Sequence, residues 1–202
     1  RYVRPWRLCV TVDVFDDSLR EGDTITLTLG DRSGGSEGSR SQTFCKEAFE
    51  FRVSVDWCGT WVYTEVPSPV FPIVNGPPEK LVVIAPSVAT PDESVWCGVK
   101  LEDRWGNPCR DYRGEVSIHE GKVQGLPNTY TFSDSDQGVH RFEGLTVSEP
   151  GIHTVHAQTQ DGKLRSESNP LVCSETLGGA RPFWGDLHGQ SEETVGTNPV
   201  SS

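Results

Sequence analysis

Asp186, His188 and Gln190 are the residues of this sequence whose types and spacing are best suited to chemistry. They alternate, so in an extended strand their side chains point to the same side. A carboxylate and a neutral imidazole placed in this way can bind one cation, or two neighbouring cations, from one edge. Because imidazole is a ligand of intermediate softness, the pair suits Zn²⁺, Mn²⁺ or Fe²⁺ better than Mg²⁺. The pattern therefore predicts that Asp186 and His188 are metal ligands.

The neighbours of this pair are consistent with a site. Gly185 and Gly189 allow the backbone to bend and a substrate to approach closely. Gln190 and Glu192 are expected to orient the metal ligands from outside the coordination sphere or to contact the substrate. The alternative is a turn-capping aspartate beside an ordinary surface histidine, since short motifs also arise by chance.

The longer string over residues 183–191, FWGDLHGQS, resembles the first motif of a bacterial family of PHP-like proteins, of the polymerase and histidinol phosphatase superfamily. The resemblance covers about residues 181–198. It implies the first strand of a distorted β/α barrel, with a di- or trinuclear metal site that activates water for attack on a phosphate ester. PHP enzymes usually carry His-x-His at this point, whereas Gln190 occupies the second His position here. Asp186 and His188 match the family's pattern.

Residues 185–190, GDLHGQ, also resemble the first motif of calcineurin-like metallophosphoesterases. In those proteins a strongly hydrophobic strand precedes the motif and an apolar helix follows it. Here ARPFW precedes it and SEETVGTNP follows it, so the context favours the PHP-like resemblance. A metal site needs three or more protein ligands. The others are therefore expected on the remainder of the catalytic domain or on another chain, and the 202-residue chain is expected to be inactive alone.

Short runs of alternating apolar and polar residues dominate the chain before residue 174. Strands are expected at residues 8–14, 23–29, 49–55, 60–66, 80–86, 94–102, 113–119, 128–132, 139–147 and 150–158. Strands at intervals of roughly ten residues favour an all-β fold of β-sandwiches. The expected fold is therefore two consecutive immunoglobulin-like β-sandwich segments, followed by the first strand of the β/α metallohydrolase barrel.

Residues 75–78, NGPP, are the best internal boundary, because a turn sequence is followed there by a stiff proline pair. We expect a sandwich-like domain over residues 1–76 and a second sandwich over 77–173. Residues 174–202 are expected to be a linker followed by the incomplete start of the catalytic domain.

The second segment resembles bacterial immunoglobulin-like and filamin-like repeats over about residues 78–173. Those repeats share an Asp-x-x-Gly-Asn-Pro turn, a Gly-x-x-x-Phe strand and a Pro-Gly-x-aromatic-x-Val strand. The resemblance implies a spacer or binding module with no chemistry of its own. In the family a tyrosine follows the Pro-Gly-x step, and its hydroxyl closes a corner of the sandwich. His153 stands there in this sequence, so an imidazole is expected to make that hydrogen bond.

Other residues that could carry chemistry are expected to have structural roles. No histidine among the sandwich strands forms an i, i+2 or i, i+4 pattern with carboxylates that would suggest a ligand set; His119 and His140 are expected to be exposed and His153 packed. The tryptophans are expected in the core and corners rather than on a sugar platform; they are Trp6, Trp57, Trp61, Trp96, Trp105 and Trp184. Six cysteines without a CxxC pair fit either free thiols or disulfides, so the compartment is left open.

The net charge of −11 and the pI of about 4.9 disfavour binding to nucleic acid or to anionic membrane surfaces. Two classes of function remain. The first is an N-terminal fragment of a metal-dependent phosphoesterase-like hydrolase, whose divalent metal is bound only in the complete protein. The second is a non-catalytic immunoglobulin-like module for binding or spacing.

Overall fold

The structure, a computed structural model, describes residues 9–16, 18–120 and 122–176. Within these residues the chain is all-β, with fourteen strands and one short 3-10 turn, η1 (Asp134–Asp136). This confirms the predicted fold class. Among the described residues, no helix is long and apolar enough to cross a bilayer. The chain divides into two compact units, residues 1–42 and 43–202, which are described separately.

The described part of the first unit, residues 9–16 and 18–42, contains turns but no strand. Apolar side chains at alternate positions are exposed there, namely Val10, Val12, Val14, Ile25, Leu27 and Leu29. The prediction of strands at 8–14 and 23–29 is therefore wrong for the residues of these ranges that the structure describes. Alternation favours a strand, but a strand also needs a neighbour that takes up its backbone hydrogen bonds.

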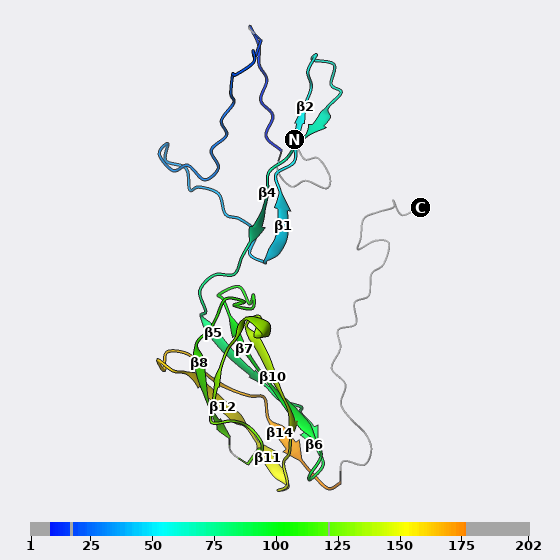
Figure 1. The fold of residues 1–202 in the computed structure, drawn as a ribbon, viewed down its shortest axis with the longest axis vertical. Coiled ribbons are helices and arrows are strands. Elements are labelled where there is room, and N and C mark those ends of the chain that lie inside the picture. Colours follow the sequence, from blue (N-terminus) through cyan, green and yellow to red (C-terminus); the bar gives the residue numbers. More distant parts are fainter. Residues whose placement is uncertain (1–8, 17, 121, 177–202) are drawn as a thin grey trace, which may run out of the picture. The chain divides into compact units, whose positions relative to one another are not determined.

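Two antiparallel two-stranded sheets begin the second unit (Figure 1). β1 (Lys46–Glu50) pairs with β4 (Val70–Ile73), and β2 (Val53–Val55) pairs with β3 (Thr64–Val66). The rings of Phe49, Phe51 and Phe71 pack together, with centroids 5.3 to 5.7 Å apart. The predicted strand at 49–55 is thus interrupted at residues 51–52, between β1 and β2, and the one at 60–66 is present only from Thr64.

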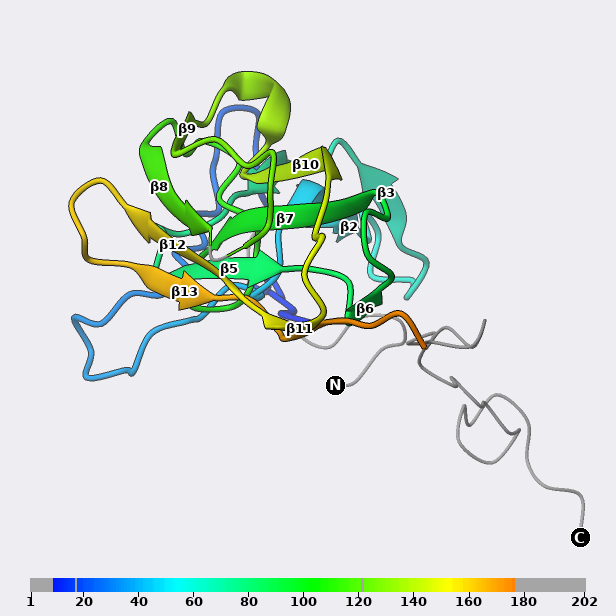
Figure 2. The same cartoon turned by 90° about the horizontal axis from the view of Figure 1, so that it is seen from below.

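Residues 80–173 fold as an immunoglobulin-like β-sandwich. One sheet has the order β10-β7-β5, with bounds Val139–Leu145, Val95–Glu102 and Lys80–Ile84. The facing sheet has the order β13-β12-β8-β9, with bounds Arg165–Glu167, Val155–Thr159, Glu115–Glu120 and Thr129–Thr131. A small sheet has the order β11-β14-β6, with bounds Gly151–His153, Leu171–Cys173 and Val88–Ala89. Figure 2 shows β12 and β13 beside β5, which they contact.

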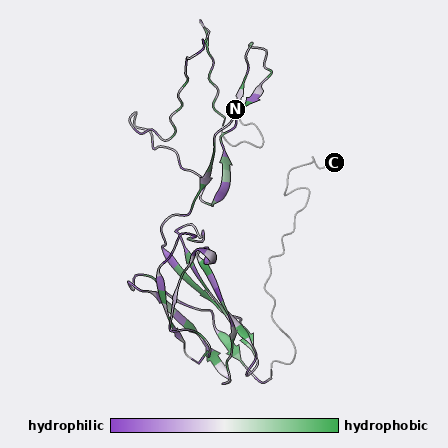
Figure 3. Ribbon diagram, viewed as in Figure 1, coloured by the Kyte–Doolittle hydropathy of each residue, from purple (hydrophilic) through white to green (hydrophobic). Residues whose placement is uncertain are grey.

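The core forms because each central strand alternates. In β7, the side chains of Val95, Cys97, Val99 and Leu101 are buried, while the residues between them are partly exposed. β12 does the same from the other sheet with Val155, so the two inner faces meet in one hydrophobic cluster. Figure 3 shows the resulting mixture of hydrophobic and hydrophilic residues along the sandwich strands.

His153, at the end of β11, hydrogen-bonds to the corner that precedes this strand. Its ring is buried, and Nε2 lies 2.8 Å from the backbone oxygen of Glu149. A carbonyl oxygen can only accept, so Nε2 carries the proton and donates. The prediction that an imidazole makes this hydrogen bond is confirmed.

The chain changes sheets between β5 and β6, and Asn169 fixes that crossing. The Ala85 N–H donates to Asn169 Oδ1 at 3.0 Å, and Asn169 Nδ2 donates to Ala85 O at 2.8 Å. After the crossing, β6 pairs in parallel with β14. The final strand of the sandwich is thus paired on both sides, by β6 and by β11.

Candidate functional site

The predicted metal ligands Asp186 and His188, with Gln190 and Glu192, lie outside the residues that the structure describes. The last described strand, β14, ends at Cys173, so all four follow the sandwich in sequence. Within the described residues no group of three or more His, Cys, Asp or Glu side chains could hold a metal ion. The metal site at the tail therefore stays a prediction.

Asp103 organises the loop between β7 and β8 with four hydrogen bonds to its buried carboxylate. Oδ1 accepts from the backbone N–H of Trp105 at 2.8 Å and of Asn107 at 2.9 Å. Oδ2 accepts from the backbone N–H of Gly76 at 3.0 Å and from Asn107 Nδ2 at 2.8 Å. Burial raises the pKa of Asp103, but these hydrogen bonds outweigh it and lower the pKa to about 2.

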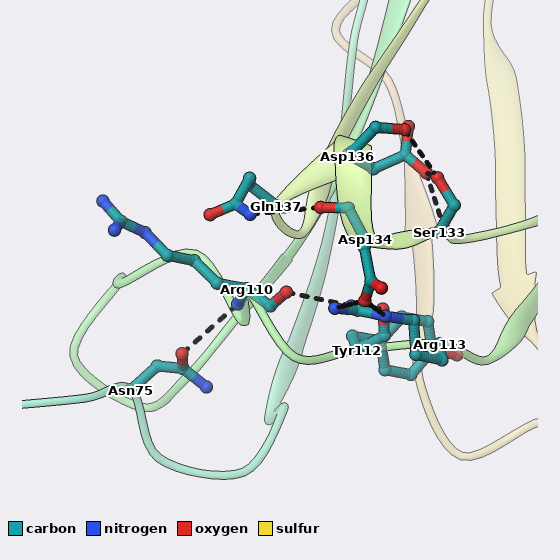
Figure 4. A network of polar contacts seen from close by, with 9 residues as sticks. Asn75, Arg110, Tyr112, Arg113, Ser133, Asp134, Asp136 and Gln137 are labelled. Carbon is teal, nitrogen blue, oxygen red and sulfur yellow. Dashed lines mark hydrogen bonds and ion pairs between the residues drawn. The ribbon is translucent and has the colours of Figure 1, made fainter.

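Asn107 extends this arrangement to the segment that leads into β1. Its Oδ1 accepts from the Cys45 N–H at 3.0 Å, and its Nδ2 also donates to Thr43 O at 2.8 Å. On the other side of the loop, Asn75 Oδ1 accepts from the Arg110 N–H at 3.2 Å, as Figure 4 shows. The loop after β7 therefore binds both the segment that precedes β1, residues 43–45, and the segment that follows β4, at Asn75.

A second polar cluster joins Tyr130 in β9, Asp136 in η1 and His140 in β10. Asp136 Oδ1 accepts from the Tyr130 hydroxyl at 2.9 Å and lies 2.7 Å from His140 Nδ1. Asp136 Oδ2 accepts from the backbone N–H of Ser133 at 2.7 Å and from its hydroxyl at 2.8 Å. The rings of Tyr130 and His140 stack, with centroids 3.9 Å apart. Because a carboxylate only accepts, Nδ1 of His140 carries the proton.

The same contacts keep the Asp136 carboxylate ionised and the Tyr130 hydroxyl protonated. Burial raises the pKa of Asp136, but the bonds from Ser133, His140 and Tyr130 outweigh it and lower the pKa to about 2. Burial, together with the hydrogen bond to Asp136 and its charge, raises the pKa of Tyr130 to about 12. Four hydrogen bonds thus end on one carboxylate, which ties η1 to β9 and β10.

The sequence pattern did not predict the cluster of Tyr130, Asp136 and His140. Asp136 and His140 do pair at i, i+4, but they form no set of three possible metal ligands among the described residues, and His140 is only partly exposed where full exposure was expected. Asp136 and His140 meet because the chain turns through η1 before it enters β10. The alternating pattern of residues 139–147 predicted a strand and gave no sign of this turn. Ser133 and Asp136 three residues apart form a capping box, which is the signal that could have located the turn.

A third arrangement is the aromatic loop, residues 56–63 between β2 and β3. The Asp56 carboxylate accepts from the backbone N–H groups of Cys58 at 3.1 Å, Thr60 at 3.1 Å and Trp61 at 2.6 Å. Burial raises the pKa of Asp56, but the bonds from Thr60, Trp61 and Cys58 outweigh it and lower the pKa. Trp61 has a φ of 65°, a left-handed conformation that non-glycine residues adopt rarely, so these bonds must hold it.

The aromatic loop presents large side chains to solvent. Trp57 is 71% exposed, Trp61 76% and Tyr63 51%. Of the expected core and corner positions, the core is therefore wrong for Trp57 and Trp61; Trp105, which is 48% exposed, lies in a turn. The hydrophobicity of Trp57 and Trp61 favoured burial, but the short hairpin offers no second layer under which they could pack. Trp6 and Trp184 lie outside the described residues.

No family model matches the chain, and no curated protein matches it. Among solved structures, a β-glycosidase from Bacteroides vulgatus is similar, at 18% identity over 54% of this chain and 16% of that chain, with a TM-score of 0.33. A proposed superoxide reductase from Thermotoga maritima is similar at 16% identity over 48% of this chain and 86% of that chain, with a TM-score of 0.30. This chain spans only 16% of the length of the glycosidase chain that it matches. Both TM-scores are too low for either likeness to bear on function.

Proposed function

We propose that this chain is the N-terminal part of a metal-dependent phosphoesterase-like hydrolase, in which the sandwich precedes the catalytic domain. The observation that carries the proposal is the string FWGDLHGQS at residues 183–191, whose resemblance is to the first PHP motif. Its position supports the proposal, because β14 completes the sandwich at Cys173 and the string follows that strand in sequence. The activity would belong to the complete protein.

Asp186 and His188 would hold Zn²⁺, Mn²⁺ or Fe²⁺ together with ligands from elsewhere. A bound metal of this kind lowers the pKa of its water and polarises a phosphoryl oxygen. His188 has to be neutral to act as a ligand, and Asp186 ionised, so metal binding by this pair weakens in acid. The neutral amide of Gln190 could donate to a phosphate oxygen, a role that an unprotonated carboxylate cannot fill.

The charge of the chain limits how a phosphate substrate could bind. A net charge of −11 repels an anionic phosphate ester at long range. Substrate binding must then depend on local positive charge, which metal cations supply. We therefore expect activity to depend on divalent metal, with little contribution from the surface of this chain.

The test compares the full-length protein that contains this chain with its Asp186→Ala/His188→Ala variant. We expect the unaltered protein to bind at least about one metal ion per chain and to hydrolyse a phosphodiester probe, bis-p-nitrophenyl phosphate. The variant is expected to lose both properties, since two ligands cannot be replaced by methyl groups. Metal is measured by mass spectrometry after dialysis, and hydrolysis by absorbance.

The matched control is Asp13→Ala/His119→Ala, which removes the same two side-chain types from exposed positions. This control is expected to keep both metal and activity. Unchanged metal content and hydrolysis in the Asp186→Ala/His188→Ala protein would overturn the site assignment. Activity without bound metal would overturn the reaction class.

A second candidate function is favoured by the aromatic loop. We infer that the module binds carbohydrate through Trp57, Trp61 and Tyr63. Exposed indole rings can stack on the apolar faces of sugar rings, and the Asp56 carboxylate fixes the loop before a ligand arrives. A fixed loop loses less conformational entropy on binding than a mobile one.

Titration calorimetry with soluble cello-, chito- and malto-oligosaccharides tests this candidate. We expect binding to at least one series with a Kd on the order of 1 mM or tighter. Trp57→Ala/Trp61→Ala should abolish it, whereas Trp105→Ala, which removes an exposed tryptophan from another loop, should leave it unchanged. Heats of dilution alone with all three series would rule against the candidate.

A further inference from the structure

Cys45 and Cys109 lie on two segments that the structure brings together. The Cys45 N–H donates to Asn107 Oδ1 at 3.0 Å, and Cys109 follows Asn107 by two residues. Beside them, Arg110 Nη1 lies 3.6 Å from Glu47 Oε1, so the residues after both cysteines also meet. These two contacts show that residues 45–47 and 107–110 lie side by side.

The position of Cys109 is fixed and that of Cys45 is more accessible. The Cys109 N–H donates to Leu101 O at 2.9 Å, and its Sγ lies 3.7 Å from Gly76 O. Cys109 is fully buried, whereas Cys45 is partly exposed, and both are free thiols in the structure. An oxidant in solution can therefore reach the sulfur of Cys45 but not that of Cys109.

The surroundings of Cys109 make its thiol slow to react. Burial, together with the charges of Asp103, Asp111 and Cys45, raises the pKa of Cys109 to about 11. Buried, high-pKa thiols react slowly, because the thiolate is the nucleophile. Formation of a bond between this pair is therefore limited by Cys109.

We propose that Cys45 and Cys109 form a disulfide in oxidising conditions, which locks the segment before β1 to the loop after β7. The oxidant is a small-molecule disulfide such as oxidised glutathione. The Cys45 thiolate attacks one sulfur of that disulfide, whose S–S bond breaks and releases one glutathione thiolate. The Cys109 thiolate then attacks the Cys45 sulfur and releases the second. Two cysteine thiols are oxidised, one disulfide is reduced to two thiols, and the proton of each cysteine passes to a departing thiolate.

The disulfide would join two segments that non-covalent contacts hold together in the described structure. Asn107 holds residues 43–45 through two hydrogen bonds, and the ion pair of Arg110 with Glu47 is exposed. Exposed ion pairs add little. A covalent bond that closes a segment this long would restrict the unfolded chain strongly. We expect oxidation to raise Tm by roughly 10 °C.

The test incubates the 202-residue chain with oxidised glutathione at pH 8 and analyses it by intact mass and by peptide mapping without reduction. We expect the Cys45 and Cys109 peptides joined in a species that lacks two hydrogen atoms, whatever glutathione the exposed Cys9 and Cys58 carry. Cys109→Ser should stop at a glutathione adduct on Cys45, and Cys45→Ser should give no joined peptide. Cys58→Ser, which alters an exposed cysteine, should behave like the unaltered chain.

The rate is a second readout. Between pH 7 and 9 closure should accelerate by about tenfold per pH unit, because the Cys109 thiolate is the limiting species. A stable glutathione adduct on Cys45 in the unaltered chain would overturn the proposal, because the two sulfurs would then not meet. Joined peptides of any other cysteine pair would overturn it as well. The outcome does not depend on whether the proposed hydrolase function holds.

Discussion

Asp103→Ala is expected to lower the free energy of unfolding by about 3–4 kcal/mol at pH 7. The change leaves three backbone N–H groups and one side-chain amide without their acceptor, and Asp103 itself is only 2% exposed. Each buried donor that loses its partner costs about 1–3 kcal/mol unless water replaces it. Urea unfolding followed by fluorescence measures the loss. Asp134→Ala, which removes an exposed carboxylate paired with Arg113, is the control and should cost below about 1 kcal/mol.

The same variant has a pH signature. The pKa of Asp103 is about 2 in the folded protein, below its usual value of 3.8. A carboxyl whose pKa is lowered by folding adds stability above its usual pKa, and this stability is lost as the pH falls through the folded-state value. The stability difference between the unaltered protein and Asp103→Ala should therefore be largest above pH 4 and shrink by about 2 kcal/mol as the pH approaches 2. A difference that is independent of pH would contradict the assigned role of the carboxylate.

Gly138→Ala is expected to lower the free energy of unfolding by about 4 kcal/mol or more. Gly138 has a φ of +78°, where an alanine is strained. A Cβ there would also lie 2.7 Å from the carbonyl carbon and 3.0 Å from the nitrogen of Cys109. These are backbone atoms that are themselves held by β7, because the Cys109 N–H bonds to Leu101 O and the Leu101 N–H bonds to Gly138 O. The clash cannot be relieved by rotation of a side chain.

Gly144→Ala is the control that separates the steric clash with Cys109 from the backbone strain of a positive φ. Gly144 has a φ of +70°, close to that of Gly138, but a Cβ there would meet no atom within 4 Å. It lies where the register of β10 against β7 shifts, a usual place for a glycine. This control should cost about 1–2 kcal/mol from conformation alone. Equal losses in the two variants, measured by urea unfolding, would show that the close approach of Gly138 to Cys109 is not maintained.

The sandwich could be predicted from sequence because its strands carry their own signal. β7 alternates through eight residues, so the range predicted from the pattern, 94–102, differs from the observed strand by one residue at its start. His153 could be assigned for a similar reason, since it occupies a defined position in a Pro-Gly-x corner and its bond to Glu149 is local. In these places local pattern and final packing agree.

The parts that could not be predicted depend on contacts between distant segments. Residues 9–14 alternate as clearly as β7, yet in the described structure they have no strand beside them. The meeting of Cys45 with Asn107 joins positions that no local pattern connects. At the candidate site, the residue types of Asp186 and His188 predict metal chemistry. The partners that would complete the site do not follow from the spacing of two residues.

The parallel pairing of β6 with β14 gives the sandwich a mechanical property. A stretching force through the chain on either side pulls the start of β6 and the end of β14 in opposite directions along the strands. The hydrogen bonds from Val172 N to Ser87 O at 2.9 Å and from Ser174 N to Ala89 O at 3.0 Å then bear load together, in shear, instead of opening one by one. Asn169 holds Ala85 just before this pair, so the load passes into β5 through a clamped point. If the sandwich lies between other parts of a longer protein, the β6–β14 pair would carry tension between them before the hydrophobic core opens.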